Sequence, residues 1–121
     1  MTSLICCLST GKGTWMKVMD VIKGQEWEKI YIITNQFGKE KFNSPKQAEY
    51  IVVDNEAKTK DIIRQIRELL NITDFEVAVN LDSGTGKEHM AVISALIQKG
   101  LSIRFVSIEN NQLLEITPYD Y

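Results

Sequence analysis

Cysteine is scarce in this chain, and its placement excludes two kinds of site. The only two cysteines, Cys6 and Cys7, are neighbours, and consecutive Cα atoms lie about 3.8 Å apart, which is shorter than a relaxed disulfide requires. Alternation along a strand would also turn the two side chains to opposite faces. We therefore expect two buried thiols, with no disulfide, redox pair or metal site, and a reducing, cytoplasmic compartment.

Long apolar runs, excess positive charge and histidine are missing as well. No stretch approaches the ~20 apolar residues that span a bilayer, and the segment "MTSLICCLST" lacks the basic start of a signal peptide. The formal charge of −2 argues against a general nucleic-acid coat. His89 is the only histidine, and the acids lack ligand spacing, so we expect no metal. Neither a membrane nor DNA is an expected partner.

Strand-like and helix-like segments alternate along the 121 residues. Apolar runs predict strands at 3–8, 28–33, 49–53, 75–80 and 101–106, and a sixth at 111–116, in the segment "QLLEIT". The "NN" before the sixth strand is too short for a parallel crossover, so that strand should be antiparallel. The sequence therefore predicts one α/β domain over residues 1–121, with a Rossmann-like, open, mostly parallel six-stranded sheet and helices on both faces.

Apolar residues at helical spacing predict three helices. The stripes are Trp15, Val18, Met19 and Ile22 in the first, Ile62, Ile63, Ile66, Leu69 and Leu70 in the second, and Met90, Ile93 and Ile97 in the third. Gly100 fits the left-handed position just past the third helix. The polar segment "NQFGKEKFNSPKQ", interrupted by Gly38 and Pro45, is expected to be a loop.

Two loops with similar composition follow the first and fourth predicted strands. "STGKGT" and "DSGTGK" both combine hydroxyls, glycines and a lysine, and ligands of such sheets bind at the carboxyl ends of strands where strand order reverses. Neither loop has the spacing of a Walker phosphate loop: in the second, Leu81 stands where the first glycine is required and Glu88 where the hydroxyl is required. We favour one pocket for a phosphodiester ligand; the alternative is two ordinary turns.

Thr85 and Glu88 fit a capping box at the start of the third helix. The box satisfies two amides, whereas a helix start has about four. The amides around Ser83 to Lys87 can therefore still face an anion, and Lys87 adds a mobile charge. His89 is expected to cap or pack, and Trp15 is expected to lie in the core or an interface, with stacking on a base as the alternative.

"CLSTGKGT" and "NLDSGTGKEHMAVISALI" resemble the CRISPR-associated Rossmann fold (CARF) domains, which bind cyclic oligoadenylate messengers across a two-fold dimer interface. The second segment is similar to the family's Asn/Asp, Ser/Thr and basic-residue pattern. The resemblance carries binding roles to Asn80, to Ser83 or Thr85, to Lys87, and to Ser9 or Thr10. The full expected ligand-binding set is Thr10, Gly11, Lys12, Asn80, Ser83, Gly84, Thr85 and Gly86.

The resemblance implies a homodimer that binds cyclic tetra- or hexa-adenylate. Family members usually carry an effector, and none is evident here, so we expect a free-standing ring nuclease or, alternatively, a non-catalytic sensor or sink that acts on a partner in trans. A third hypothesis is an interaction protein without a nucleotide.

The ring-nuclease reaction requires neither metal nor cofactor. A ribose 2′-hydroxyl attacks the neighbouring phosphate and leaves a 2′,3′-cyclic phosphate, so the protein has only to orient the hydroxyl and stabilise charge. We assign charge stabilisation to Lys87 and orientation of the phosphate to Ser9 as the catalytic residues. Two-fold symmetry would place two copies of each around the ring.

Overall fold

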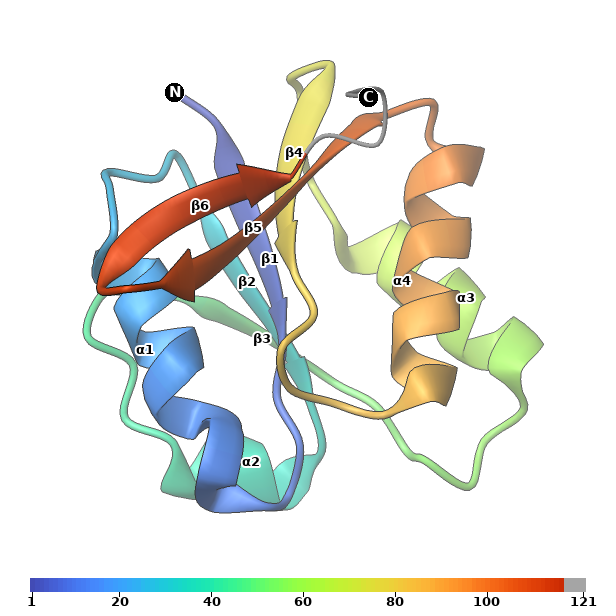
Figure 1. Cartoon of the computed structure of the whole chain (residues 1–121). Coiled ribbons are helices and arrows are strands. Elements are labelled where there is room, and N and C mark those ends of the chain that lie inside the picture. The colour runs from blue at the N-terminus through green and yellow to red at the C-terminus, as the bar shows by residue number, and fades with distance from the viewer. Residues whose placement is uncertain (117–121) are drawn as a thin grey trace.

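The computed structural model describes residues 1–116 and shows an α/β fold with one six-stranded sheet (Figure 1). The strands are β1 (Ser3–Cys7), β2 (Ile30–Thr34), β3 (Glu49–Val52), β4 (Glu76–Asn80), β5 (Ser102–Glu109) and β6 (Gln112–Ile116). Their order in the sheet is β3-β2-β1-β4-β5-β6. Four parallel pairings join the first five strands, and β6 is antiparallel to β5. The mixed sheet with an antiparallel last strand is confirmed.

The central position of β1 explains its unbroken run of apolar residues. All five residues of β1 are buried, and the strand pairs with β2 on one side and β4 on the other. Because successive side chains point to opposite faces, a strand covered on both faces favours consecutive apolar residues, as at Leu4 to Cys7. Strand order reverses between β1 and β4, so the loops that follow these two strands begin at neighbouring points on one edge of the sheet.

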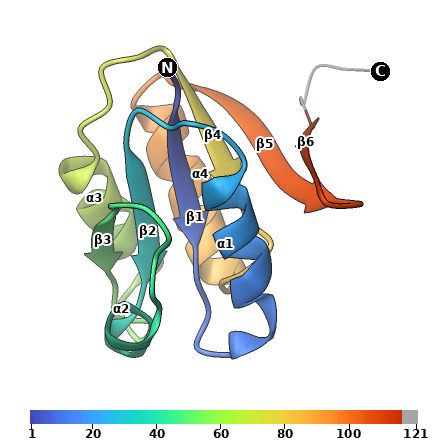
Figure 2. The same ribbon diagram turned by 90° about the vertical axis from the view of Figure 1, so that its left-hand side faces the viewer.

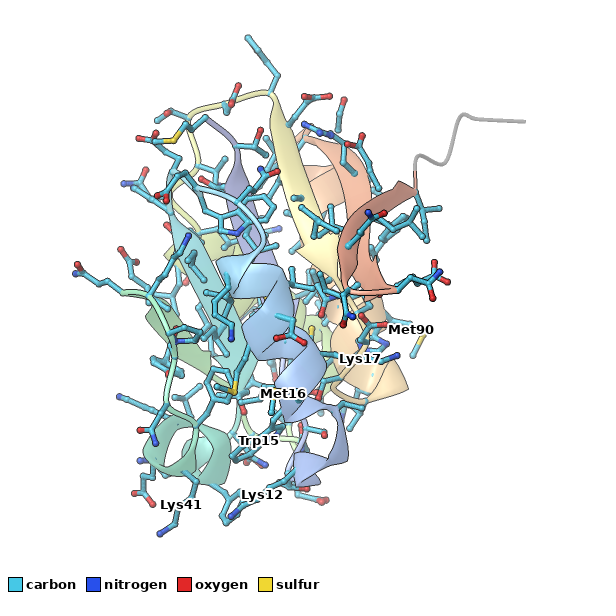
Figure 3. All side chains as sticks on the ribbon, turned by 60° about the vertical axis from the view of Figure 1, so that its left-hand side comes forward. Lys12, Trp15, Met16, Lys17, Lys41 and Met90 are labelled. Atoms are coloured by element: carbon cyan, nitrogen blue, oxygen red, sulfur yellow. The ribbon has the colours of Figure 1, made fainter. Side chains whose placement is uncertain are left out.

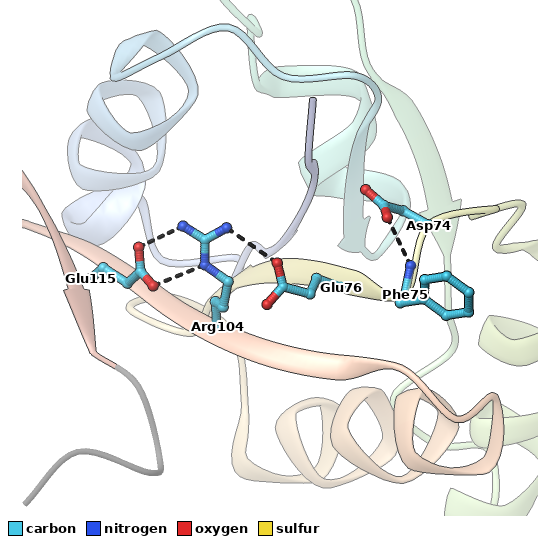
Figure 4. A network of polar contacts seen from close by, with 5 residues as sticks. All are labelled: Asp74, Phe75, Glu76, Arg104 and Glu115. Atoms are coloured by element: carbon cyan, nitrogen blue, oxygen red, sulfur yellow. Dashed lines mark hydrogen bonds and ion pairs between the residues drawn. The ribbon is translucent and has the colours of Figure 1, made fainter.

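The C-terminal hairpin forms where the sequence predicts it. Asn110 and Asn111 have φ values of 52° and 63°, as two-residue hairpin turns require. Arg104 on β5 donates from Nε to Glu115 Oε1 at 2.8 Å on β6, and its Nη1 lies 3.6 Å from Glu76 Oε1 on β4 (Figure 4). One guanidinium thus links three adjacent strands. Thr117, the last residue of the expected strand segment, lies outside the described residues.

Three predicted helices are present and a fourth was missed. The four α-helices of the described residues are α1 (Trp15–Lys23), α2 (Gln36–Lys41), α3 (Thr59–Leu69) and α4 (Gly86–Gln98), and a 3₁₀ turn, η1 (Lys12–Thr14), precedes α1. Gly100 follows α4 with φ of 74°, as expected. The prediction of a loop in the segment that contains α2 was wrong.

The helix α2 is difficult to predict from the sequence because it contains a glycine, Gly38, that is required for packing. Asn35 caps the helix by accepting from the amide of Gly38 at 2.9 Å. A Cβ at Gly38 would lie 1.9 Å from Thr34 Oγ1, so the helix can lie against the end of β2 only with glycine at this position. What looks like a helix breaker is therefore a requirement for close approach.

The apolar stripe proposed for α4 does not face the core. Met90 and Ile97 are 61% and 65% exposed, whereas the buried apolar residues of α4 are Ala91, Val92, Ala95 and Leu96. The small residues on the inner face allow α4 to pack closely against the sheet and α3. Apolar side chains occur at helical spacing on both faces of α4, so periodicity could not identify the buried face, and the prediction took the outer face for it.

Two separate groups of buried side chains form the core. One combines Ile5 and Cys7 of β1 with residues of α3 and α4, and the other combines Leu4 and Cys6 with residues of α1. Figure 2 shows β1 and β2 pointing toward the end of the molecule where α2 and the start of α1 lie. No helix within residues 1–116 combines the length and apolar character needed to cross a bilayer.

Candidate functional site

The loops after β1 and β4 are joined by a hydroxyl cluster. Ser83 is 3% exposed, and its Oγ accepts from the amide of Ser9 at 2.8 Å and from Thr14 Oγ1 at 2.6 Å. The same hydroxyl donates to Ser9 Oγ at 3.1 Å. Two segments more than seventy residues apart in sequence are thus held together by one side chain. Thr14 was not among the predicted site residues, although it belongs to the same hydroxyl-rich loop.

The first loop presents its backbone and a lysine to solvent. Ser9 Oγ donates to Gly11 O at 2.9 Å, and Trp15 Nε1 donates to Ser9 O at 2.9 Å. Thr10, Gly11 and Lys12 are exposed. The Lys12 ammonium lies 5.7 Å from the centre of the Trp15 ring, a distance at which a cation and an aromatic face attract each other. Trp15 itself is only 8% exposed, which leaves its ring no open face for a base.

The capping box at the start of α4 is confirmed. Thr85 Oγ1 accepts from the amide of Glu88 at 3.1 Å, and Glu88 Oε1 accepts from the amide of Thr85 at 2.9 Å. The first intrahelical bond runs from the amide of His89 to Thr85 O. The amides of Gly86 and Lys87 precede it and so have no acceptor within the helix. Both remain suitable for an anion at this helix end.

The turn into α4 is shaped by Gly84 and His89. Gly84 has φ of 96°, and a Cβ there would lie 2.7 Å from Cys7 Cβ. His89 Nε2 lies 2.7 Å from Ser83 O. Because a carbonyl oxygen can only accept, Nε2 is the protonated nitrogen of this contact. The imidazole therefore fixes the loop backbone, which agrees with the expected packing role of His89.

Lys87, the residue assigned to charge stabilisation, extends away from the hydroxyl cluster. Its Nζ donates to Asn55 O at 2.9 Å and to Ala57 O, two carbonyls in the loop between β3 and α3. Within residues 1–116, no hydrogen bond joins Lys87 to Ser9 or Ser83. The structure joins Ser9 to Ser83 by a hydrogen bond, whereas no hydrogen bond among residues 1–116 joins Ser9 to Lys87, the other residue assigned to catalysis.

Asn80, at the end of β4, belongs to a buried polar network. It is 0% exposed, and its Nδ2 donates to Val106 O and to Asp82 Oδ2, both at 2.8 Å. Ser107 Oγ also donates to Asp82 Oδ2, at 2.6 Å. Asn80 Oδ1 is buried without a partner among the described residues. Ser107 was missed because its role depends on the pairing of β5 with β4.

Burial and nearby carboxylates disfavour ionisation of the two thiols. The pKa of Cys6 is raised by burial and, to a smaller extent, by the negative charge of Asp82. The pKa of Cys7 is raised by burial first, then by Glu88 and by Cys6. A thiol is a poor nucleophile while protonated, so neither cysteine contributes reactive chemistry to this site. The described residues hold no group of three or more His, Cys, Asp or Glu side chains arranged to ligate a metal.

A hollow of about 520 Å³ lies beside the site, at the carboxyl ends of β2 and β3. Asn35, Gln36, Asp54 and Asn55 are among its lining residues. None of the predicted site residues lines it, but the Asn55 carbonyl accepts from Lys87. Lys87 therefore links the start of α4 to a residue that lines this hollow.

Glu88 makes the stability of the helix start depend on pH. It is 2% exposed, and burial raises its pKa above 4.5, opposed by the hydrogen bonds with Thr85 and by the charge of His89. Because the folded state then holds its proton more tightly than the unfolded state, this carboxyl lowers the free energy of unfolding as pH rises from about 4.5 through the raised pKa. Above that window the loss is complete.

We expect Glu88→Gln to remove this pH dependence, because the amide oxygen of glutamine can still accept from Thr85. Urea unfolding of both proteins between pH 4 and pH 7 measures the effect. The stability of the variant relative to wild type should increase with pH, and a difference of one pKa unit corresponds to ~1.4 kcal/mol. A constant difference across this range would show that Glu88 titrates normally.

The sequence was also compared with known proteins. No protein-family model matches the chain, and no curated protein is found as a relative, so a functional assignment depends on the residues of the site.

Proposed function

We propose that the joined loops after β1 and β4 bind a cyclic oligoadenylate, cyclic tetra- or hexa-adenylate, as part of a CRISPR antiviral response. The observation that carries the proposal is the Ser83 hydroxyl, which fixes both loops at the reversal of strand order. Ligands of open α/β sheets bind at this position. The two segments that resemble CARF domains are the ones that meet here.

We also propose that the fold is Rossmann-like, with helices on both faces of the sheet. Alternating residues of β1 belong to two different core groups, one with α3 and α4 and the other with α1. Figure 1 shows α1 and α2 on one side of the strands and α3 and α4 on the other. This arrangement would direct α1 and α4 toward the ligand from opposite faces of the sheet.

A homodimer is the proposed functional unit, and the cytoplasm is its proposed location. The outer side of α4 supports a second copy, because Met90 and Ile97 are largely exposed at positions seven residues apart on one helix face. Apolar side chains of this size gain stability when a partner covers them. A two-fold axis would give one ring two copies of each loop.

Ring opening is the proposed reaction. The 2′-oxygen would bond to the phosphorus as the bond to the 5′-oxygen breaks, and the proton released from the 2′-hydroxyl would balance the one gained by the 5′-oxygen. Ser9 would orient the phosphate. Lys87 has three N–H donors and uses two on carbonyls, which leaves one for a phosphate oxygen. If the ring is retained intact, the alternative is a sensor or sink acting on a partner in trans.

We expect Ser83→Ala to weaken ring binding by about tenfold or more, because it leaves the Ser9 amide and the Thr14 hydroxyl without their acceptor. Calorimetric titration with cyclic tetra- and hexa-adenylate measures the change.

Lys12→Ala should also weaken ring binding and reduce its salt dependence. The slope of log affinity against log salt should fall by roughly 0.7 for each phosphate that the side chain no longer neutralises.

Ser102→Ala is the matched control. Ser102 is an exposed serine at the first position of β5, at the end of the sheet away from the joined loops, so this variant should bind the rings as wild type does. If Ser83→Ala binds the rings as tightly as Ser102→Ala, or wild type binds neither ring, the joined loops are not the ligand site.

A further inference from the structure

A second surface beside the joined loops is rich in lysine and aromatic side chains. The segments 9–19 and 35–43 contain four lysines, Lys12, Lys17, Lys39 and Lys41, and one acid, Glu40, although the whole chain has a net charge of −2. Within residues 1–116 none of these lysines forms an ion pair. Glu40 instead accepts from Gln36 at 3.0 Å. Positive charge is therefore in excess over these two segments, and none of the four lysines is held in an ion pair.

Ring contacts bring the two segments together. The rings of Trp15 and Phe37 are 6.2 Å apart, and those of Trp15 and Phe42 are 5.6 Å apart. The ammonium of Lys12 lies 5.9 Å from the centre of the Phe37 ring. Lys41 follows Phe37 by four residues on α2, so both side chains occupy one helix face. Figure 3 shows Lys12 and Lys41 at the same end of the molecule, with Trp15 beside Lys12.

Phe37 is the aromatic residue of this group that remains available to a ligand. It is 40% exposed, whereas Trp15 and Phe42 are 8% and 4% exposed and form the layer beneath it. An exposed ring on a rigid aromatic base, with the Lys12 ammonium 5.9 Å from its centre and Lys41 one helical turn away, suits a nucleobase together with the phosphates that flank it. An acidic peptide would satisfy the lysines but would gain little from the exposed ring.

We propose that Lys12, Phe37 and Lys41 form a binding surface for linear single-stranded RNA, with a base stacked on Phe37 and the backbone phosphates on the two lysines. This goes beyond the proposed ring binding, because Phe37 and Lys41 lie outside the joined loops and belong to no predicted ring contact. The charge of the surface is complementary to a phosphodiester chain, and the stacking requires no particular sequence.

Fluorescence anisotropy with a labelled hexamer of riboadenylate tests the proposal. Phe37→Leu, which keeps an apolar side chain against Trp15, should weaken binding about tenfold. Lys41→Ala should weaken it and lower the salt dependence by about 0.7 in the log-log slope. One matched control is Phe75→Leu, at an 83% exposed ring just before β4. The other is Lys60→Ala, at an exposed lysine of α3. Both variants should bind as wild type does. Thermal unfolding identifies any variant that has lost its fold.

Two further measurements separate this surface from other partners and from the ring site. A hexamer of abasic ribose phosphates should bind more weakly than riboadenylate. Equal binding of the two hexamers would contradict base stacking on Phe37. An acidic peptide that binds more tightly than either hexamer would contradict RNA as the partner. Phe37→Leu should bind cyclic oligoadenylate normally, whereas Ser83→Ala should weaken the binding of rings more than that of the linear strand. Linear binding that is unchanged in Phe37→Leu and Lys41→Ala would refute the proposal, whatever the result with rings.

Discussion

The Lys87→Ala protein is expected to open a cyclic oligoadenylate about a hundredfold more slowly than wild type while still retaining some intact ring. A cation that meets charge developing during the reaction acts on the rate more than on ground-state affinity, and loss of one such donor costs ~3 kcal/mol in a water-poor site. Chromatography of each ring after incubation with protein in EDTA measures the linear product, and titration measures the ring that stays bound.

Two other variants decide what a slower reaction means. Lys99→Ala removes an exposed lysine at the far end of α4 and should react as wild type does. His89→Ala should also stay active, because the imidazole contacts the Ser83 carbonyl and the proposed route uses no dedicated base. An inactive His89→Ala protein that binds normally would indicate acid–base catalysis. Wild-type protein that holds the ring for hours without opening it would leave only the sensor.

The position of Lys87 gives this experiment a second possible result. Its ammonium is bonded to the carbonyls of Asn55 and Ala57, so Lys87→Ala also frees the loop between β3 and α3. If the variant cleaves at the normal rate but unfolds more easily, Lys87 is a tether of that loop and not a catalytic residue. A slower reaction at unchanged stability indicates the catalytic role, and a lower stability at an unchanged rate indicates the tether.

The sheet could be predicted well from the sequence because each strand corresponds to a short run of apolar residues bounded by polar or turn residues. From Leu4 to Cys7 the run in β1 is apolar because both faces of the strand are covered. The antiparallel pairing of β6 followed from a two-residue connection that permits no other direction. Predicted strand boundaries differ by at most three residues from those observed, as for the strand expected at 28–33 and found at Ile30–Thr34.

The errors arose where one residue type serves two purposes. Gly38 is read as a helix breaker but is required by contact with Thr34. The stripe of Met90, Ile93 and Ile97 is read as a core face, yet the smaller Ala91 and Ala95 lie in the core instead. The spacing of residue types along the chain cannot settle whether Gly38 lies in a helix or which face of α4 is buried. Both depend on contacts with other parts of the chain.

The candidate site was predictable in its loops but not in its side-chain directions. Strand order places "STGKGT" next to "DSGTGK", and the capping box follows from Thr85 and Glu88 alone. The direction of Lys87 depends on carbonyls thirty and thirty-two residues away. A long, flexible side chain follows the strongest acceptors within reach, and their place is fixed only by the complete fold.

Replacing Gly84 with alanine is expected to reduce the free energy of unfolding by roughly 2–4 kcal/mol, because it combines a left-handed backbone with overpacking. The backbone has φ of 96°, and the new Cβ would lie 2.7 Å from Cys7 Cβ and 3.0 Å from Glu88 Oε1. Cys7 is on the central strand and Glu88 is part of the capping box, so neither can move without disturbing the core or the helix start. Urea unfolding monitored by circular dichroism measures the loss.

Gly86→Ala and Gly13→Ala are matched controls, since a Cβ at either position meets nothing within 4 Å. Gly86 is the first residue of α4, where alanine favours the helix more than glycine does, so that variant should be as stable as wild type or more so. If Gly84→Ala is no less stable than these two, the turn can adopt another conformation, and the rigid alignment of Ser83 with Ser9 would no longer support a preformed site. If it is destabilised and also binds no ring at a temperature where it is folded, the left-handed turn itself holds the hydroxyl cluster in place.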